Sequence, residues 1–300
     1  MISFLKCQLT SHFHQFKPSN YATSNNFSLL PHSSSSTLHA PPPAATSKGR
    51  IICLGASGLV GKSVSLAAQE AGYAVTGVSR NKPTDWLPTP SANDEYVEMD
   101  CTDSDAVESL ISSRNKEGVP IVAVVHSVGA LFDGESGLGK LNAFASGVGS
   151  VPAPTASYDD ITRKTAFAAI DSLALRKNIP FVFVSCAEAG WPDMTGGSFV
   201  ENNLAPDFLK RYLKAKRAVE SRLGEEKDLR STIFRPSLIY TNTKTRPPPV
   251  LAFTAANLVG IPFVDKPTSV EDLTKGIMKA VESDVVSGVK RESDIQAMIS

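Results

Sequence analysis

The stretch from residue 50 to residue 62 reads Arg-Ile-Ile-Cys-Leu-Gly-Ala-Ser-Gly-Leu-Val-Gly-Lys. An apolar run therefore leads directly into three glycines and then into a helical pattern. This order predicts a buried strand, a tight turn and a helix whose N-terminal N–H groups can bind the pyrophosphate of a dinucleotide. A glycine triplet alone also fits a plain structural turn, but the flanking strand and helix favour the nucleotide-binding interpretation. The residues expected to bind the dinucleotide here are Gly55, Ser57, Gly58, Leu59, Val60 and Gly61.

Residues 1–48 differ in composition from the rest of the chain. They contain no Asp or Glu, are rich in Ser, Thr, Asn and His, and include a serine run at 33–36 and a proline tract at 41–43. Such a segment cannot bury enough apolar surface to offset its ordering entropy, so we expect it to be disordered. It has no apolar run long enough for a secretory signal or a membrane span. The composition favours an organelle transit peptide over a plain disordered tail, and the lack of arginine favours a plastid.

Residues 49–300 fit a single α/β domain with a sizeable core. Strands and helices are expected to alternate along it, which predicts a doubly wound, mostly parallel Rossmann sheet with ligands at the carboxyl ends of the strands. We also expect a small C-terminal substrate lobe at about residues 237–300 and a long functional loop at 132–154. The expected strands are Ile51–Leu54, Ala74–Val78, Tyr96–Met99, Ile121–His126, Phe181–Ser185 and Ser231–Phe234. The expected helices are Lys62–Ala71, Ser104–Ser113, Asp159–Arg176 and Asp207–Leu223, with a further capped helix opening at Ser269.

Charge and cysteine content narrow the classes of partner. The formal net charge is zero and no basic patch is present, so nucleic acid is not an expected partner. The four cysteines have no metal or redox spacing, and we expect no metal site. Cys53 and Cys186 fall in apolar strands and are interpreted as small buried hydrophobes. No transmembrane segment is expected.

The end of the second strand predicts the choice of cofactor. It reads Val78-Ser79-Arg80, where an enzyme that prefers NAD would place an acidic residue for the ribose hydroxyls. Ser79 and Arg80 instead suit a 2′-phosphate through charge-assisted hydrogen bonds, and NADP is therefore favoured over NAD. The alternative is that Arg80 is an ordinary surface arginine.

The next two strand ends add further candidates for cofactor contact. Asp100 and Cys101 follow the third strand, and Asp100 could accept a hydrogen bond from the adenine amino group or cap the next helix. The fourth strand ends at His126, which we expect to be packed or hydrogen-bonded rather than catalytic. The small residues after it, expected to lie beside a cofactor ribose, are Ser127, Val128 and Gly129.

Candidate catalytic residues come from the fifth strand and the helix after it. Ser185 ends the strand, and Tyr212 and Lys216 are four residues apart, on one face of the predicted helix. A lysine charge would lower the pKa of the phenol, so that Tyr212 could act as a general acid or base. Ser185 would hold the substrate oxygen beside it.

Taken together, these residues resemble the short-chain dehydrogenases/reductases, in their extended or atypical branch. The resemblance covers about residues 49–283 and is carried by Gly55-x-x-Gly58-x-x-Gly61, Ser185, Tyr212-x-x-x-Lys216 and Arg235-Pro236-Ser-Leu-Ile-Tyr240. Within the branch the chain is similar to the nucleotide-binding accessory subunit of complex I and to relatives associated with coenzyme Q biosynthesis. The resemblance implies that Tyr212 supplies a proton, Lys216 binds the cofactor ribose and Pro236 lies along the nicotinamide. Thr162 stands about where extended members carry an asparagine, which puts the proton relay in doubt.

Two functions follow from this resemblance. The first is an organellar NADP-dependent oxidoreductase acting on a carbonyl or an apolar, quinone-like substrate. The alternative is a non-catalytic NADP-binding accessory or assembly factor within a respiratory or ubiquinone-biosynthesis protein complex. The resemblance favours a mitochondrion, while the composition of residues 1–48 favours a plastid. An RNA-associated protein on the same fold is disfavoured by the neutral charge.

Overall fold

The structure, a computed structural model, describes residues 47–115, 118–139, 142, 152–176, 179–242 and 248–300. These residues belong to one unit, Ser47–Ser300. The expected leader, residues 1–48, lies outside the described residues except for its last two. The same holds for much of the loop expected at 132–154.

Seven strands among the described residues form one sheet in the order β3-β2-β1-β4-β5-β6-β9. Every neighbouring pair in this sheet is parallel. The order reverses between β1 and β4, which places the ligand-binding switch point at their carboxyl ends. The expected doubly wound Rossmann sheet is confirmed. Its strands are β1 (Arg50–Leu54), β2 (Ala74–Ser79), β3 (Glu95–Glu98), β4 (Ile121–His126), β5 (Phe181–Val184), β6 (Ser231–Phe234) and β9 (Gly288–Lys290).

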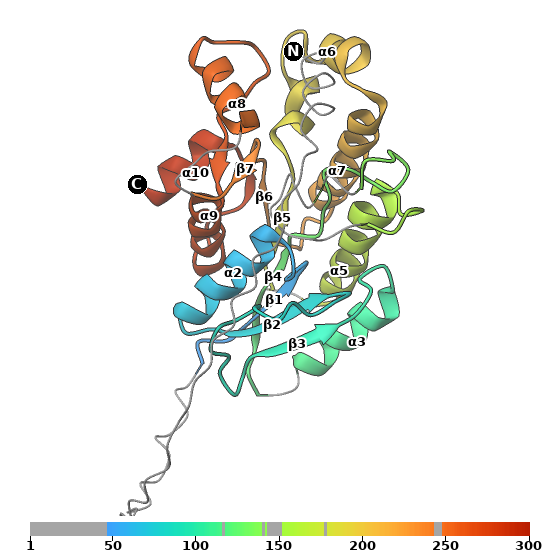
Figure 1. Cartoon of the computed structure of the whole chain (residues 1–300). Helices are drawn as coiled ribbons and strands as arrows, with labels where there is room; N and C mark the ends of the chain where they lie inside the picture. The colour runs from blue at the N-terminus through green and yellow to red at the C-terminus, as the bar shows by residue number, and fades with distance from the viewer. Residues whose placement is uncertain (1–46, 116–117, 140–141, 143–151, 177–178, 243–247) are drawn as a thin grey trace, which may run out of the picture. The chain divides into compact units, whose positions relative to one another are not determined.

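Helices cover both faces of the sheet (Figure 1). On one face α2 packs against α9, and α10 packs against α9; on the other, α5 packs between α3 and α7. The helices on the first face are α2 (Leu59–Glu70), α9 (Val270–Glu282) and α10 (Glu292–Ile299). Those on the second are α3 (Ser104–Arg114), the π-helical η2 (Asp159–Lys164), α5 (Thr165–Ala174) and α7 (Asp207–Glu225). The 3₁₀ helix η3 (Ala187–Asp193) and α6 (Gly197–Leu204) lie between β5 and α7 in the chain.

Strand β1 shows why the apolar runs in the sequence are continuous. All five of its residues are buried. Ile51 and Cys53 belong to the core cluster on the α2 and α9 face, and Ile52 and Leu54 to the cluster on the α3 and α5 face. Side chains alternate between the two faces of a strand, so a sheet covered on both sides requires apolar residues at successive positions.

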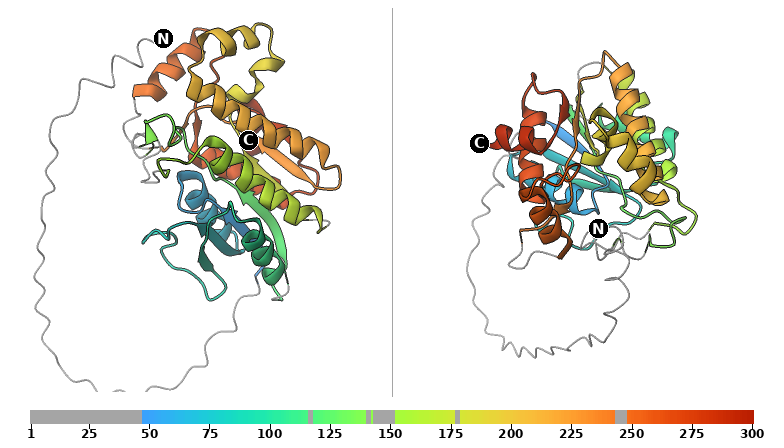
Figure 2. Two further views of the ribbon diagram at one scale, coloured as in Figure 1. Left: turned by 90° about the vertical axis from the view of Figure 1, so that its right-hand side faces the viewer. Right: turned by 90° about the horizontal axis from the view of Figure 1, so that it is seen from above.

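The C-terminal part differs from the expected lobe at residues 237–300. The short strands β7 (Ile239–Tyr240) and β8 (Thr268–Ser269) form a separate parallel pair, with α8 (Pro248–Leu258) between them in the chain. From α9 onward the chain returns to the main sheet, because α9 packs on α2 and β9 pairs with β6. Helices α6 and α8 lie at the same end of the domain (Figure 2).

Helix α9 begins as expected. Its N-cap is Ser269, whose hydroxyl accepts a hydrogen bond from the Asp272 backbone N–H at 3.0 Å. This cap satisfies one of the N–H groups that a helix N-terminus leaves without a partner. Within the described ranges, no helix combines the length and apolar character needed to cross a membrane.

Candidate cofactor and catalytic site

A cavity of about 730 Å³ opens at the carboxyl ends of β1, β2 and β4. Its position is the switch point of the sheet, where open α/β folds bind ligands. Most of the residues expected to contact a dinucleotide line it: Gly55, Ser57, Gly58, Ser79, Arg80, Asp100, Cys101, Ser127, Val128 and Gly129. Sequence reasoning missed further lining residues, among them Asn81, Lys82, Pro152, Ala153, Thr155, Ala156, Asp160 and Lys164. Pro152 and Ala153 belong to the loop at 132–154, whose composition predicted a functional segment.

The glycine turn approaches the neighbouring backbone too closely for side chains. Gly55 has φ +88°, and a Cβ there would lie 2.8 Å from the backbone nitrogen of Val128. A Cβ on Gly61 would lie 2.2 Å from the carbonyl oxygen of Gly55. The turn therefore needs glycine at both positions, for a left-handed backbone at the first and for close packing of α2 at the second.

The N-terminus of α2 follows this turn and has neither a side-chain cap nor an acidic residue in its first turn. Its N-cap is Gly58. The N–H groups of Leu59, Val60 and Gly61 are the ones that a helix leaves without an intrahelical partner. The expected cofactor contacts of these three residues therefore concern their backbone, and the helix end fits an anionic pyrophosphate.

Arg80 directly follows β2 and lines the cavity. Its side chain is exposed and, among the described residues, makes no hydrogen bond or ion pair. Lys82 lines the same part of the cavity, while the hydroxyl of Ser79 donates to the carbonyl of Asn81 at 2.8 Å. An unpaired guanidinium at the end of β2 fits a 2′-phosphate.

Of the two roles considered for Asp100, the structure gives that of helix cap to another residue, Asp103. The N-cap of α3 is Asp103, whose carboxylate accepts from the N–H groups of Asp105 and Ala106 at 3.1 and 3.0 Å. Asp100 instead accepts from the backbone N–H and hydroxyl of Thr102, both at 3.0 Å, and lines the cavity. Its contact with adenine stays a prediction.

His126 is a buried structural residue, as expected. Its Nε2 lies 2.9 Å from the hydroxyl of Thr165, and its ring packs against those of Phe181 and Phe183. Burial, with a smaller effect from the charge of Lys216, lowers its pKa to about 3. The imidazole is therefore neutral at physiological pH.

Lys216 is buried beside the cavity. Its Nζ donates to the carbonyl of Val184 at 2.7 Å and lies 5.5 Å from the centre of the Tyr212 ring. Burial lowers its pKa to about 8. A Cβ on the cavity residue Gly129 would lie 3.7 Å from Nζ, which places the ammonium just behind the cavity wall. Its contact with a ribose stays a prediction.

The expected lowering of the Tyr212 pKa is wrong. Burial raises the pKa of Tyr212 well above its usual value, and Cys186 and Glu188 raise it further. Desolvation of the phenolate is the largest cause, so the phenol remains protonated at neutral pH. Its ring packs edge to face on that of Tyr158, with centroids 5.3 Å apart.

The hydroxyl of Ser185 is bound to a residue other than Tyr212. Ser185 donates to Glu220, which also accepts from Arg235 at 2.6 and 3.1 Å. Glu220 follows Tyr212 by eight residues on α7, or about 12 Å along the helix axis. The next residue, Cys186, belongs to the small apolar cluster against which Tyr212 packs. Sequence reasoning missed this placement, for which the only signal was the position of Cys186 after β5.

Pro236 and Thr162 are two further residues that the sequence assigned to the site. Pro236 accepts at its carbonyl from the N–H of Ala187 at 2.8 Å, beyond the carboxyl end of β6. Thr162 falls in the π-helical η2 and is fully buried, and its hydroxyl has no partner among the described residues. In the parts of the chain that the structure describes, no group of three or more potential ligands is arranged for a metal ion.

Comparisons with known proteins agree with this geometry. A family model described as NAD(P)H-binding matches residues 55–284. No curated protein sequence matches at a significant level. Among solved structures, the chain is similar to the Bordetella bronchiseptica enzyme WbmH in complex with NAD⁺, with 17% identity and a TM-score of 0.52 over 81% of this chain and 74% of that one. It is also similar to UDP-glucose 4-epimerase of Thermotoga maritima with UDP-glucose, with 16% identity and a TM-score of 0.51 over 81% of this chain and 76% of that one. Similarity to solved structures at this level of identity shows the fold alone. The family model confirms the expected NAD(P)-binding Rossmann family.

Proposed function

Because the chain belongs to the NAD(P)H-binding family, we propose that it is an organellar NADP-dependent oxidoreductase that reduces a carbonyl or quinone-like substrate. The observation that carries the cofactor choice is the unpaired, exposed Arg80 at the end of β2, where no carboxylate stands to accept ribose hydroxyls.

The residues of the cavity fit the dinucleotide. The glycine turn and the uncapped start of α2 bind its pyrophosphate, and Arg80 binds the 2′-phosphate. When bound, NADPH supplies a hydride. Tyr212 donates the proton that the reduced oxygen needs, since burial keeps its phenol protonated at neutral pH. Cys186 lies beside the phenol and takes the place of Ser185 in holding the substrate oxygen.

The C-terminal segment supports an apolar substrate. Residues 247–264 contain no charged side chain. Three of its aliphatic side chains, those of Leu251, Leu258 and Val259, are exposed on or just after α8. This segment has few polar side chains that could bind the hydroxyls of a sugar, and an apolar ring system such as a quinone fits it better.

The test uses residues 47–300, which form one compact unit. NADPH and NADH are titrated separately by calorimetry, and the loss of nicotinamide absorbance is then followed with a short-chain ubiquinone. We expect tighter binding of NADPH and oxidation that Tyr212→Phe abolishes while sparing NADPH affinity. Tyr73→Phe, directly before the amino end of β2 and so away from the cavity at the carboxyl ends, is the matched control. Full activity in Tyr212→Phe would remove this residue from the mechanism.

The second candidate, a non-catalytic NADP-binding accessory or assembly factor, is favoured by one contact. The single donor of the Ser185 hydroxyl is bound to Glu220 within the protein. Tight NADPH binding without oxidation of any carbonyl or quinone in a wider screen would support this function over catalysis.

A further inference from the structure

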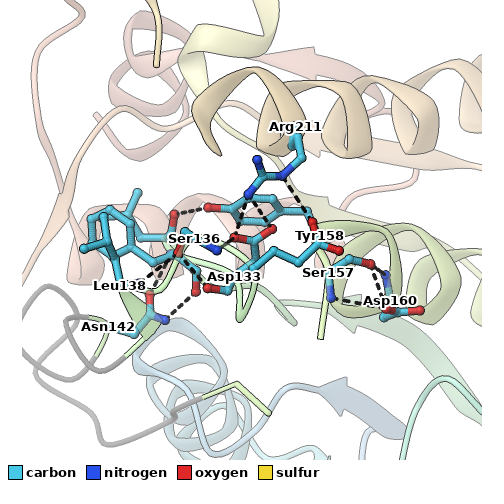
Figure 3. Close-up of polar contacts among 11 residues, drawn as sticks. Asp133, Ser136, Leu138, Asn142, Ser157, Tyr158, Asp160 and Arg211 are labelled. Carbon is cyan, nitrogen blue, oxygen red and sulfur yellow. Dashed lines mark hydrogen bonds and ion pairs between the residues drawn. The ribbon is translucent and has the colours of Figure 1, made fainter. Parts of the chain in front are cut away.

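The loop after β4 is joined to the helix that carries Tyr212 by an ion pair whose carboxylate is fully buried. Asp133 is fully buried, and each of its carboxylate oxygens lies 3.2 Å from Nη2 of Arg211 on α7. Figure 3 shows Arg211 reaching from the helix to the loop. Arg211 directly precedes Tyr212 in the sequence.

Two ring contacts hold the same loop against the first turns of α7. The hydroxyl of Tyr158 donates to the carbonyl of Leu131 at 2.7 Å, while its ring packs edge to face on Tyr212. The rings of Phe132 and Phe208 lie 5.3 Å apart. Together with the ion pair, these contacts fix one face of the helix, because positions three and four apart are neighbours on its surface.

The loop also packs on a wall of the cofactor cavity. That wall includes Pro152, Ala153, Thr155 and Ala156. The N–H of Gly134 donates to the carbonyl of Ala156 at 2.8 Å, and a Cβ on Gly134 would lie 2.3 Å from the carbonyl oxygen of Ala153. The two backbones are therefore in direct contact, with no side chain between them.

Because Asp133 is buried, the loop at 131–136 is held at one position relative to Arg211 on α7. A buried carboxylate is costly unless it is paired and hydrogen-bonded, and Asp133 accepts from the N–H of Ser136 at 2.9 Å as well as from Arg211. The loop cannot move away from α7 without leaving this charge unpaired. An apolar side chain at the same place would stabilise packing but would not select one position for Arg211.

We propose that Asp133 is a positioning residue that fixes the cavity wall relative to α7, so that cofactor binding and the placement of the Tyr212 phenol are coupled. The path runs from the wall at 152–156, through the loop at 131–136, to Arg211 and Tyr212. This proposal rests on the proposed function, in which the cavity binds NADPH and Tyr212 donates the proton.

The test compares the full-length chain with Asp133→Asn and with a matched control. Glu201→Gln is the control, since it also removes the carboxylate partner of an arginine on α7, here Arg217. Hydrogen exchange is measured with and without NADPH, and NADPH affinity by calorimetry. In Asp133→Asn we expect faster exchange at residues 152–156 and 207–213, and an NADPH affinity lower by about tenfold. NADPH should still protect residues 55–61 but no longer residues 207–213, a loss that a purely structural role would not cause.

Several outcomes would overturn the proposal. Exchange at 207–213 that matches the wild type in Asp133→Asn would do so, as would equal effects of Glu201→Gln. A wild type that binds no NADPH would refute the proposed function and the coupling together, while the exchange without cofactor would still decide whether Asp133 fixes the wall to α7. Should Asp133→Asn fail to fold, Arg211→Lys keeps the charge and should show the same pattern at a smaller size.

Discussion

The pKa of Lys216 gives a prediction for the stability of the protein. Burial lowers this pKa from 10.5 to about 8. Below pH 8 both the folded and the unfolded chain carry the proton, and the folded chain bears the cost of the buried charge. Between pH 8 and 10.5 the unfolded chain still binds the proton while the folded chain does not, so stability rises with pH through this window. The full cost corresponds to about 3 kcal/mol, of which about 2 kcal/mol is relieved between pH 7 and pH 9.5.

The assay is urea unfolding of the wild type and Lys216→Met at both pH values. Other groups titrate in this range, but they contribute alike to the two proteins and cancel in the difference between them. We therefore expect the free energy of unfolding of the wild type to increase by about 2 kcal/mol relative to Lys216→Met on going from pH 7 to pH 9.5. Lys214→Met, an exposed position two residues earlier on α7, should show no such change. A difference between wild type and Lys216→Met that does not vary with pH would refute the reasoning.

Further predictions concern the choice of cofactor, the glycine turn, Ser185 and residues 1–48. Arg80→Asp should weaken NADPH binding roughly 10- to 100-fold without weakening NADH binding, because it removes charge-assisted hydrogen bonds to a phosphate; calorimetry showing unchanged selectivity would contradict the 2′-phosphate contact. Gly61→Ala should destabilise the fold by about 1–3 kcal/mol in urea unfolding, whereas Gly224→Ala, with open space around its Cβ, should not. Ser185→Ala should retain quinone reduction, and its loss would restore Ser185 as a substrate ligand. Residues 1–48 fused to a fluorescent protein should direct it to mitochondria or plastids, and a cytosolic signal would argue against a transit peptide.

The main sheet could be predicted because its strands carry long apolar runs. Strand β9 could not, since it has only three residues, lies at the sheet edge and begins with Gly288. Helix α8 was missed for a different reason. It opens with Pro248 and is apolar along its length, so it has neither a polar face nor a polar cap to mark it. Proline is tolerated in the first turn of a helix, where its missing N–H would have no partner.

The cofactor side of the site was predictable from strand order, whereas the catalytic side was not. Residues at the carboxyl ends of neighbouring parallel strands lie at the same edge of the sheet, so their order in the sequence is enough to place them together. The choice between Ser185 and Cys186 depends instead on a single position. Successive residues at a strand end point to opposite sides, so an error of one residue exchanges the side chain facing Glu220 with the one facing Tyr212.

The hydrogen-bonding capacities of Ser185 and Lys216 separate the two proposed functions further. A serine hydroxyl has one donor, and that of Ser185 is used by Glu220. A protonated lysine has three donors, of which the bond to Val184 uses one, leaving two on a group just behind the Gly129 wall. The bond to Val184 is therefore compatible with a ribose contact, whereas the bond of Ser185 is not compatible with donation to a substrate. Catalysis at this site would thus depend on Tyr212, Lys216 and Cys186.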